Sequence, residues 1–104
     1  MPTRRRPVFF VSDRTGITVE MLGNSLLSQF EGFDFQRNTV PYVDTPERVA
    51  ETVAEINSAG AREGVPPIVF SSLVDVQMSA QLAQADALFL DFFQVFIAIP
   101  WPDF

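Results

Sequence analysis

The residues of this sequence that could carry chemistry are small polar and acidic side chains that follow apolar runs. The stretch VFFVSDRTGIT, residues 8–18, places Ser-Asp-Arg-Thr-Gly directly after four apolar residues. Similar polar residues follow two further apolar stretches of the chain. The candidates for a ligand site are Ser12, Asp13, Arg14, Thr15, Gly16, Thr18, Asp44, Ser71, Ser72 and Asp75. Such residues can form an anion site or a metal site, but they also cap helices and form turns.

The first group of candidates has the composition of an anion-binding loop. Free N–H groups and the helix dipole favour negative charge where a helix begins. Gly16 would let the backbone approach a ligand closely, and Arg14 could add a bidentate contact to a phosphate. Carboxylates at several strand ends could also bind Mg²⁺, because hard cations prefer oxygen ligands. Capping and turn formation is the commoner role of these residue types, and both alternatives stay open at this stage.

The composition excludes several other kinds of site. The chain has 104 residues, no cysteine and no histidine, and all seven of its basic residues are arginine. Histidine bases, thiolate chemistry, Schiff bases and a phosphate-binding lysine are therefore excluded. The net charge of −6 argues against broad binding of nucleic acid. No apolar stretch reaches the roughly 18 residues of a membrane span, and no signal peptide is recognised, so we expect a cytoplasmic protein.

The elements that must position the candidates alternate between strands and helices. Apolar runs rich in β-forming residues predict strands over residues 8–12, 33–43, 67–71 and 87–91. Helical spacing predicts helices over residues 17–30 and 76–85, and another that starts at Pro46 and ends at Gly60 or Gly64. Residues 92–98 could form a further helix. This order predicts an α/β fold, in which about four strands form a mostly parallel sheet with helices on its faces. The carboxyl ends of such strands are where ligands bind.

Local signals predict the ends and the buried faces of the helices. In the first helix, the predicted apolar face consists of Leu22, Leu26, Leu27 and Phe30. In the second helix, Thr45 is the expected N-cap and Pro46 the first helical residue. Its predicted core face consists of Val49, Val53 and Ile56, flanked by Ala50 and Ala54. Gly60 and Gly64 are expected to end this helix, and Pro41 to mark an edge or the end of the second strand.

Four stretches of the sequence together resemble a known family. They are VFFVSDRTGIT-x-E-x-LG-x-SLL-x-QF, VPYVDT, PIVFSSLVD and LFLDFFQVFI. They resemble the phosphoenolpyruvate synthase regulatory proteins, which include the plant pyruvate, phosphate dikinase regulatory proteins. The resemblance covers about residues 7–98. Arg14 stands where the family commonly has glycine.

The resemblance implies a bifunctional serine/threonine kinase and pyrophosphorylase. Such an enzyme phosphorylates a threonine of its target synthase or dikinase with ADP, and reverses this with inorganic phosphate. ADP, phosphate and Mg²⁺ are therefore expected for the full-length family. Its nucleotide site is a lysine-containing P-loop in a C-terminal half, whereas this sequence contains no lysine and no GxxxxGK[ST] motif. No catalytic or cofactor-binding residue can be carried over, so we expect a non-catalytic N-terminal domain that lacks kinase activity alone.

The resemblance and the composition together divide the chain into three parts. Residues 1–6 are predicted to form a basic tail, residues 7–98 the α/β domain, and residues 99–104 a divergent end. The segment from residue 87 onward carries six aromatic residues and only two charges. It could fill the domain's own core, or it could form a patch that drives self-association. The expected partners are the synthase or dikinase, the C-terminal half and a second copy of the chain.

Three functional hypotheses remain open from the sequence. In the first hypothesis, the chain is a non-catalytic domain whose first loop binds an anion or helps to recognise the target. Alternatively, it is a dimerisation or interaction module in which that loop is only a helix cap. A third alternative is a stand-alone small α/β enzyme that uses Asp13 as a base or a metal ligand.

Overall fold

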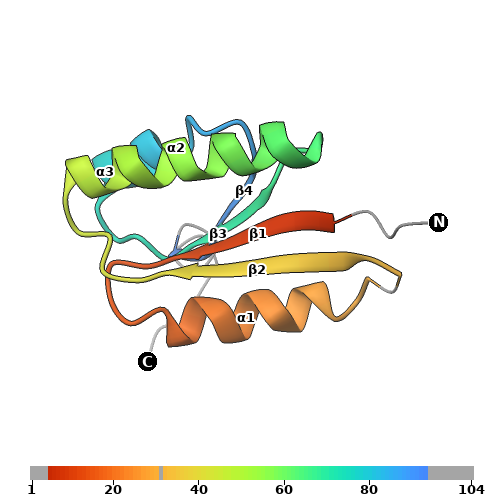
Figure 1. The fold of residues 1–104 in the computed structure, drawn as a ribbon. Helices are drawn as coiled ribbons and strands as arrows, with labels where there is room; N and C mark the ends of the chain where they lie inside the picture. Colours follow the sequence, from red (N-terminus) through yellow and green to blue (C-terminus); the bar gives the residue numbers. More distant parts are fainter. Residues whose placement is uncertain (1–4, 31, 94–104) are drawn as a thin grey trace, which may run out of the picture.

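A single parallel sheet forms the centre of the molecule. The computed structural model describes residues 5–30 and 32–93. Its strands are β1 (Arg5–Val11), β2 (Asp34–Val40), β3 (Ile68–Ser71) and β4 (Leu88–Asp91). They pair in the order β2-β1-β3-β4, and each neighbouring pair is parallel (Figure 1). The predicted α/β fold with a four-stranded parallel sheet is therefore confirmed.

Helices lie on both faces of this sheet. The helix α1 (Ile17–Leu27) lies on one face, whereas α2 (Pro46–Glu63) and α3 (Val76–Leu82) lie on the other (Figure 1). The chain leaves β1 toward α1 and leaves β3 toward α3, so these adjacent strands feed opposite faces. In open α/β sheets, ligands bind beyond the carboxyl ends of strands at such a change of direction. No helix in residues 5–30 and 32–93 is long and apolar enough to span a membrane.

The buried side chains form one cluster on each face of the sheet. Successive residues of β1 alternate between the two clusters, because side chains of a strand point to opposite faces. Phe9 and Val11 pack toward α2, whereas Val8 and Phe10 pack toward α1. Both sets are almost inaccessible to solvent. This double burial explains why the run at residues 8–11 is continuously apolar.

The helix α1 buries a different face from the one predicted. Its buried residues are Val19, Gly23 and Leu27. Of the predicted apolar face, only Leu27 is buried, whereas Leu22, Leu26 and Phe30 are exposed. Gly23 explains the difference, because a Cβ there would lie 2.4 Å from an aromatic carbon of Phe10. The glycine therefore lets the helix backbone approach the sheet directly at this position.

The local signals of α2 are confirmed at both ends. The Thr45 side chain accepts a hydrogen bond from the Arg48 amide at 3.1 Å, and Pro46 is the first helical residue. The C-cap is Gly64 in the left-handed conformation, so Gly60, which was also expected to end the helix, lies within it.

The core face of α2 is confirmed only in part. Val49 and Ile56 are fully buried and Val53 is partly buried. Ala50 and Ala54 were predicted beside them but are exposed. Thr52 and Ala59 are buried instead. The Thr52 hydroxyl can be buried because it donates a hydrogen bond to the Arg48 carbonyl at 2.8 Å.

Most predicted elements are longer than the observed ones, whereas β1 starts earlier than predicted. Arg5 and Arg6, assigned to a basic tail, lie in this strand. Pro41 follows the last residue of the edge strand β2, as its missing N–H predicts. The predicted helix over residues 92–98 falls mostly outside the described residues, as do residues 1–4 and 99–104. The other predicted domain boundaries stay predictions.

Candidate functional site

Three loops meet where the strands end, at the carboxyl edge of the sheet. The loop after β1 is held to the loop after β2 by backbone hydrogen bonds. The Val43 amide donates to the Ser12 carbonyl at 2.9 Å, and the Tyr42 amide donates to the Arg14 carbonyl at 2.8 Å. On the other side, the amide of Ser72 donates to the carbonyl of Val11 at 3.0 Å. The backbone therefore brings the first residues after the three strands together.

Asp13 connects the loops of the two strands that feed opposite faces. Its Oδ2 accepts a hydrogen bond from the Val74 amide at 3.2 Å, although the two residues are 61 positions apart. This contact places the loop after β1 beside the loop after β3, at the position where ligands bind in sheets of this topology. The contact between the loop after β1 and the loop after β3, which the sequence could not establish, is thus observed at Asp13 and Val74.

The start of α1 offers backbone donors without a side-chain cap. Gly16 occupies the N-cap position with a φ of 87°, in the left-handed region, and no side chain caps this helix end. A Cβ at Gly16 would also lie 3.0 Å from a methyl carbon of Thr39. The first intrahelical bond of α1 runs from the amide of Glu20 to the carbonyl of Gly16. The amides of residues 17–19 have no partner within the helix, and they carry the positive end of its dipole.

Three side chains beside these donors are free to bind a ligand. In the part of the chain that the structure describes, Arg14, Thr15 and Thr18 are exposed. Their side chains make no hydrogen bond or ion pair with other described residues. A guanidinium and two hydroxyls are suitable donors for phosphate oxygens. These three side chains are the kind of donors that an anion site requires.

Other candidates already have a structural role. The Ser12 hydroxyl accepts a hydrogen bond from the Arg14 amide at 3.0 Å, and the Ser71 hydroxyl accepts one from the Leu73 amide at 3.3 Å. Asp75 caps α3 by accepting a hydrogen bond from the Met78 amide at 2.9 Å. Asp44 is exposed and precedes the N-cap of α2, and Ser72 is partly buried. The capping and turn roles are observed, and the ligand role stays a prediction.

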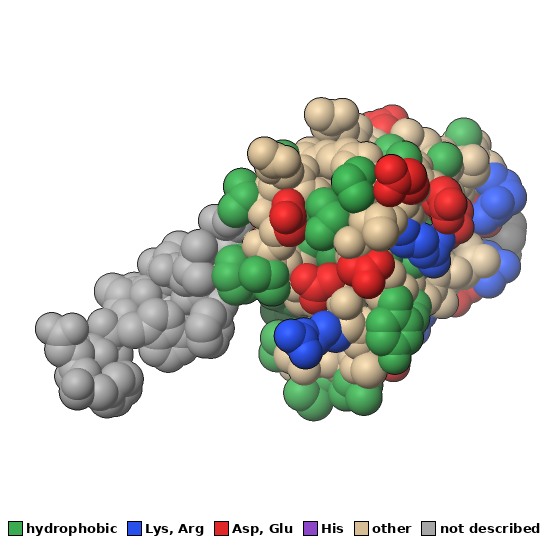
Figure 2. Space-filling view, turned by 90° about the vertical axis from the view of Figure 1, so that its left-hand side faces the viewer, with side chains coloured by type: hydrophobic (Ala, Val, Ile, Leu, Met, Phe, Trp, Pro, Cys, Tyr) green, Lys and Arg blue, Asp and Glu red, His purple; other side chains and the backbone are tan. Residues whose placement is uncertain are grey.

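The charges at this edge are mostly acidic. Figure 2 looks at the end of the molecule where the strands finish, and acidic side chains gather near the centre of this face. Within residues 5–30 and 32–93, no three acidic side chains, histidines or cysteines lie close enough together to hold a metal ion. Asp13, Asp44 and Asp75 would repel a bare anion over short distances. Repulsion of this kind is reduced when a cation accompanies the anion.

Tyr42 is a feature of this edge that the sequence analysis missed. Its φ is 58°, which side-chain-bearing residues rarely adopt, and its side chain is 61% exposed. The bond from its amide to the carbonyl of Arg14 holds the loop after β2 in this conformation. Only the preceding Pro41 marks this segment as a turn in the sequence, and proline does not predict a positive φ for the residue after it.

Comparison with protein families gives one match that covers most of the chain. A family described as kinase/pyrophosphorylase matches residues 8–99. This range contains all ten candidate residues of the carboxyl edge.

Individual relatives carry provisional names that agree with each other. A protein of Alkalilimnicola ehrlichii, provisionally named phosphoenolpyruvate synthase regulatory protein, is 51% identical over 98 residues. Proteins with the same provisional name in Stenotrophomonas maltophilia strain K279a and Bordetella avium are 52% and 46% identical over 92 and 93 residues. The three alignments cover 94%, 88% and 89% of this chain. They cover only 35%, 34% and 34% of those relatives, so this chain spans about a third of their length.

Proposed function

Because this chain belongs to the kinase/pyrophosphorylase family, we propose that it acts as the N-terminal, non-catalytic domain of an enzyme that regulates phosphoenolpyruvate synthase. In this proposal the whole enzyme phosphorylates a threonine of the synthase with ADP. It removes that phosphate with inorganic phosphate and releases pyrophosphate. The provisional names of the relatives support the synthase as the target in preference to a dikinase.

Two observations support a non-catalytic role for this chain. It spans about a third of its relatives' length. It also lacks lysine and any GxxxxGK[ST] motif, the elements with which a P-loop binds nucleotide phosphates. The chemistry of nucleotide binding therefore belongs to another part of the enzyme, and this chain contributes recognition or ligand sensing.

We further propose that the carboxyl edge binds a phosphate-containing ligand together with Mg²⁺. The observation that carries this proposal is the hydrogen bond from the Val74 amide to Asp13, which joins the two loops at the change of direction of the sheet. The uncapped amides of α1 and the free side chain of Arg14 lie in the same loop region. Phosphate oxygens can accept hydrogen bonds from both.

An amide NMR titration tests the ligand site. Phosphate, pyrophosphate, ADP and phosphoenolpyruvate are added in turn, each with and without Mg²⁺. We expect saturable shifts centred on residues 13–18 and 71–75 for at least one ligand, and tighter binding with Mg²⁺. Unchanged spectra with all four ligands would contradict the site and leave only its capping role.

Two arginine variants show whether the shifts come from specific binding. Arg14→Ala is expected to weaken the affinity at least about tenfold, which corresponds to about 1.4 kcal/mol. Arg62→Ala is the matched control, because Arg62 lies in the last turn of α2, far along the chain from the candidate loop. Equal weakening by both variants would indicate a general charge effect and contradict a specific site.

A phosphate-transfer assay tests the absence of catalysis. The chain alone, mixed with the synthase and ADP labelled at its β-phosphate, is expected to leave the synthase unlabelled. Transfer of label to the synthase by this chain would contradict the non-catalytic role. It would favour the third hypothesis, a small enzyme that uses Asp13.

An interaction module without a ligand is the second candidate function. The observation that favours it is the set of exposed large apolar side chains, which includes Leu26, Phe30, Phe33 and Leu88. This candidate predicts unchanged spectra in the titration and a binding partner that covers those side chains.

A further inference from the structure

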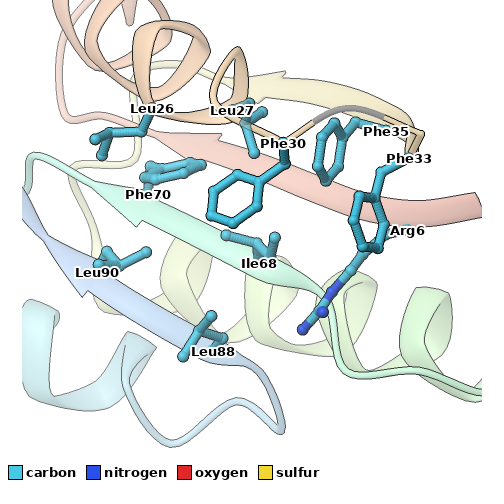
Figure 3. Close-up of a pocket in the computed structure, with 10 residues that line it drawn as sticks. All are labelled: Arg6, Leu26, Leu27, Phe30, Phe33, Phe35, Ile68, Phe70, Leu88 and Leu90. Atoms are coloured by element: carbon cyan, nitrogen blue, oxygen red, sulfur yellow. The ribbon is translucent and has the colours of Figure 1, made fainter.

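An apolar groove of about 410 Å³ lies on the α1 face of the sheet. The helix α1 and the turn that follows it form one wall, with Leu26, Phe30 and Phe33. Strands β3 and β4 form the floor and the other wall, with Ile68, Leu88 and Leu90 (Figure 3). The groove exists because α1 packs against β1 and β3, and no described helix covers the edge strand β4 on this face (Figure 1).

The chain turns toward this groove directly after β4. Phe92 follows the strand and stacks on Phe70, with ring centroids 5.4 Å apart and planes 14° apart. Phe70 itself lines the groove and also stacks on Phe10. Phe92 therefore belongs to the cluster on the α1 face and not to the one beneath α2. Phe93, the last described residue, therefore lies two residues after the end of β4, next to Phe92 and the groove.

The residues that follow have the chemistry of a core segment. Residues 94–104 read QVFIAIPWPDF and contain one charged side chain. Their large apolar residues are Val95, Phe96, Ile97, Ile99, Trp101 and Phe104. An extended chain advances about 3.3–3.6 Å per residue, so this segment can run back along the four-residue strands to the start of β1. There, Arg6 lies at the far end of the groove, and the only charge of the segment is Asp103.

We propose that residues 94–104 fold back along the α1 face and fill this groove with their apolar side chains. The segment would then cover part of the α1 face of the sheet, as α2 and α3 cover the opposite face. A second copy of the chain is a weaker candidate, because the segment is covalently joined to Phe93 and therefore meets this groove at a high effective concentration.

A small-molecule ligand fits this groove less well. Ligand pockets usually add a few converging polar groups to an apolar lining. Among the ten lining residues, Arg6 has the one polar side chain, and its Nε already donates to the Pro66 carbonyl at 3.0 Å. The remaining lining of the groove is apolar, and a chain segment rich in aliphatic and aromatic residues can pack against it.

Trp101 gives a direct test, because it is the only tryptophan of the chain. Its fluorescence is measured in the intact protein at low concentration, where the protein is monomeric by light scattering. We expect emission at short wavelength and protection from quenching by acrylamide. Leu88→Asp places a charge in the groove and is expected to shift the emission to longer wavelength and raise the quenching constant.

A matched control separates the groove from a general surface effect. Val76→Asp introduces the same charge at an exposed apolar residue at the start of α3, on the opposite face. It is expected to leave Trp101 emission unchanged. Should Leu88→Asp fail to fold by circular dichroism, Phe33→Ser tests the same groove from the turn after α1, where Phe33 is exposed.

Three results would overturn the proposal. Trp101 could be fully accessible to acrylamide in the monomer. It could be protected but unaffected by both groove variants, which would place the segment elsewhere. Its protection could also appear only at concentrations where light scattering detects a dimer, which would identify a second copy as the occupant.

Discussion

The two faces of the sheet differ in how much apolar surface they bury. Among residues 5–30 and 32–93, eleven buried residues form one cluster beneath α2 and α3, whereas six form the cluster beneath α1. Several large side chains on the α1 side are about half exposed, including Leu26 and Leu88. Two described helices, α2 and α3, cover one face of the sheet, whereas α1 is the described helix on the other. Most of the folding free energy is therefore expected from the α2 face, because the α1 face leaves more of its large apolar side chains exposed.

The largest expected effect comes from a cavity on the covered face. Ile56 is fully buried between α2 and the sheet, in the larger cluster. Ile56→Ala removes its packing, and we expect the free energy of unfolding to fall by about 2–5 kcal/mol. Urea denaturation followed by circular dichroism measures this loss. Ser58→Ala, on the exposed side of the same helix, is the control, and an equally small effect of both variants would contradict the comparison.

On the α1 face, the largest effect is expected from overpacking at Gly23. An alanine Cβ there would lie 2.4 Å and 2.9 Å from two carbons of Phe10, and 3.0 Å from one of Phe70. Gly23→Ala is therefore expected to destabilise the protein by about 1–3 kcal/mol, although alanine is the better helix former. The same denaturation experiment measures it, with Ser25→Ala on the exposed side of α1 as control. A gain in stability would mean that α1 does not pack this closely against the sheet.

The contrast between α1 and α2 also explains what the sequence could predict. The ends of α2 depend on local chemistry: Thr45 was predicted as the N-cap, and Gly64 was one of the two glycines predicted to end the helix. The buried face of α1 depends on its contact with Phe10, which is distant in sequence. The spacing of apolar residues predicted that Leu22 and Leu26 would be buried. Gly23 was not included in that face because glycine has no apolar side chain. Helix propensity and periodicity cannot reveal such a close approach.

The candidate site shows the same division between local and distant information. Parallel strands of an α/β sheet end at one edge, so the sequence could predict that the candidates follow strand ends at that edge, but not which of them come together. The bond between Asp13 and the Val74 amide joins positions 61 residues apart, and no local signal specifies it. The positive φ of Tyr42 likewise depends on its bond to the Arg14 carbonyl. Whether this edge binds a ligand is a separate question for titration.

The carboxyl edge supplies a prediction that connects the two faces. Asp13 joins the loop leading to α1 with the loop leading to α3, through the Val74 amide. Asp13→Ala removes this acceptor, and we expect a loss of about 0.5–1.5 kcal/mol in the free energy of unfolding. NMR is expected to report a large shift for the Val74 amide. Asp13→Asn keeps an acceptor oxygen, so we expect it to retain most of the stability and most of the original Val74 amide shift. Equal effects of the alanine and asparagine variants would contradict this role for the bond.

The smallest expected effect concerns the exposed side of α2, where side chains form ion pairs and are not buried. Arg48 lies 3.2 Å from Glu51 and 3.9 Å from Glu55, and both carboxylates are largely exposed. Glu51→Gln is expected to change the free energy of unfolding by no more than about 0.5 kcal/mol, because water and salt screen exposed ion pairs. Denaturation at low and high salt checks this, and the difference between the proteins should shrink as salt rises. A loss as large as that of Ile56→Ala would contradict the comparison of the two faces. It would mean that the α2 face contributes more stability through ion pairs and not through apolar burial.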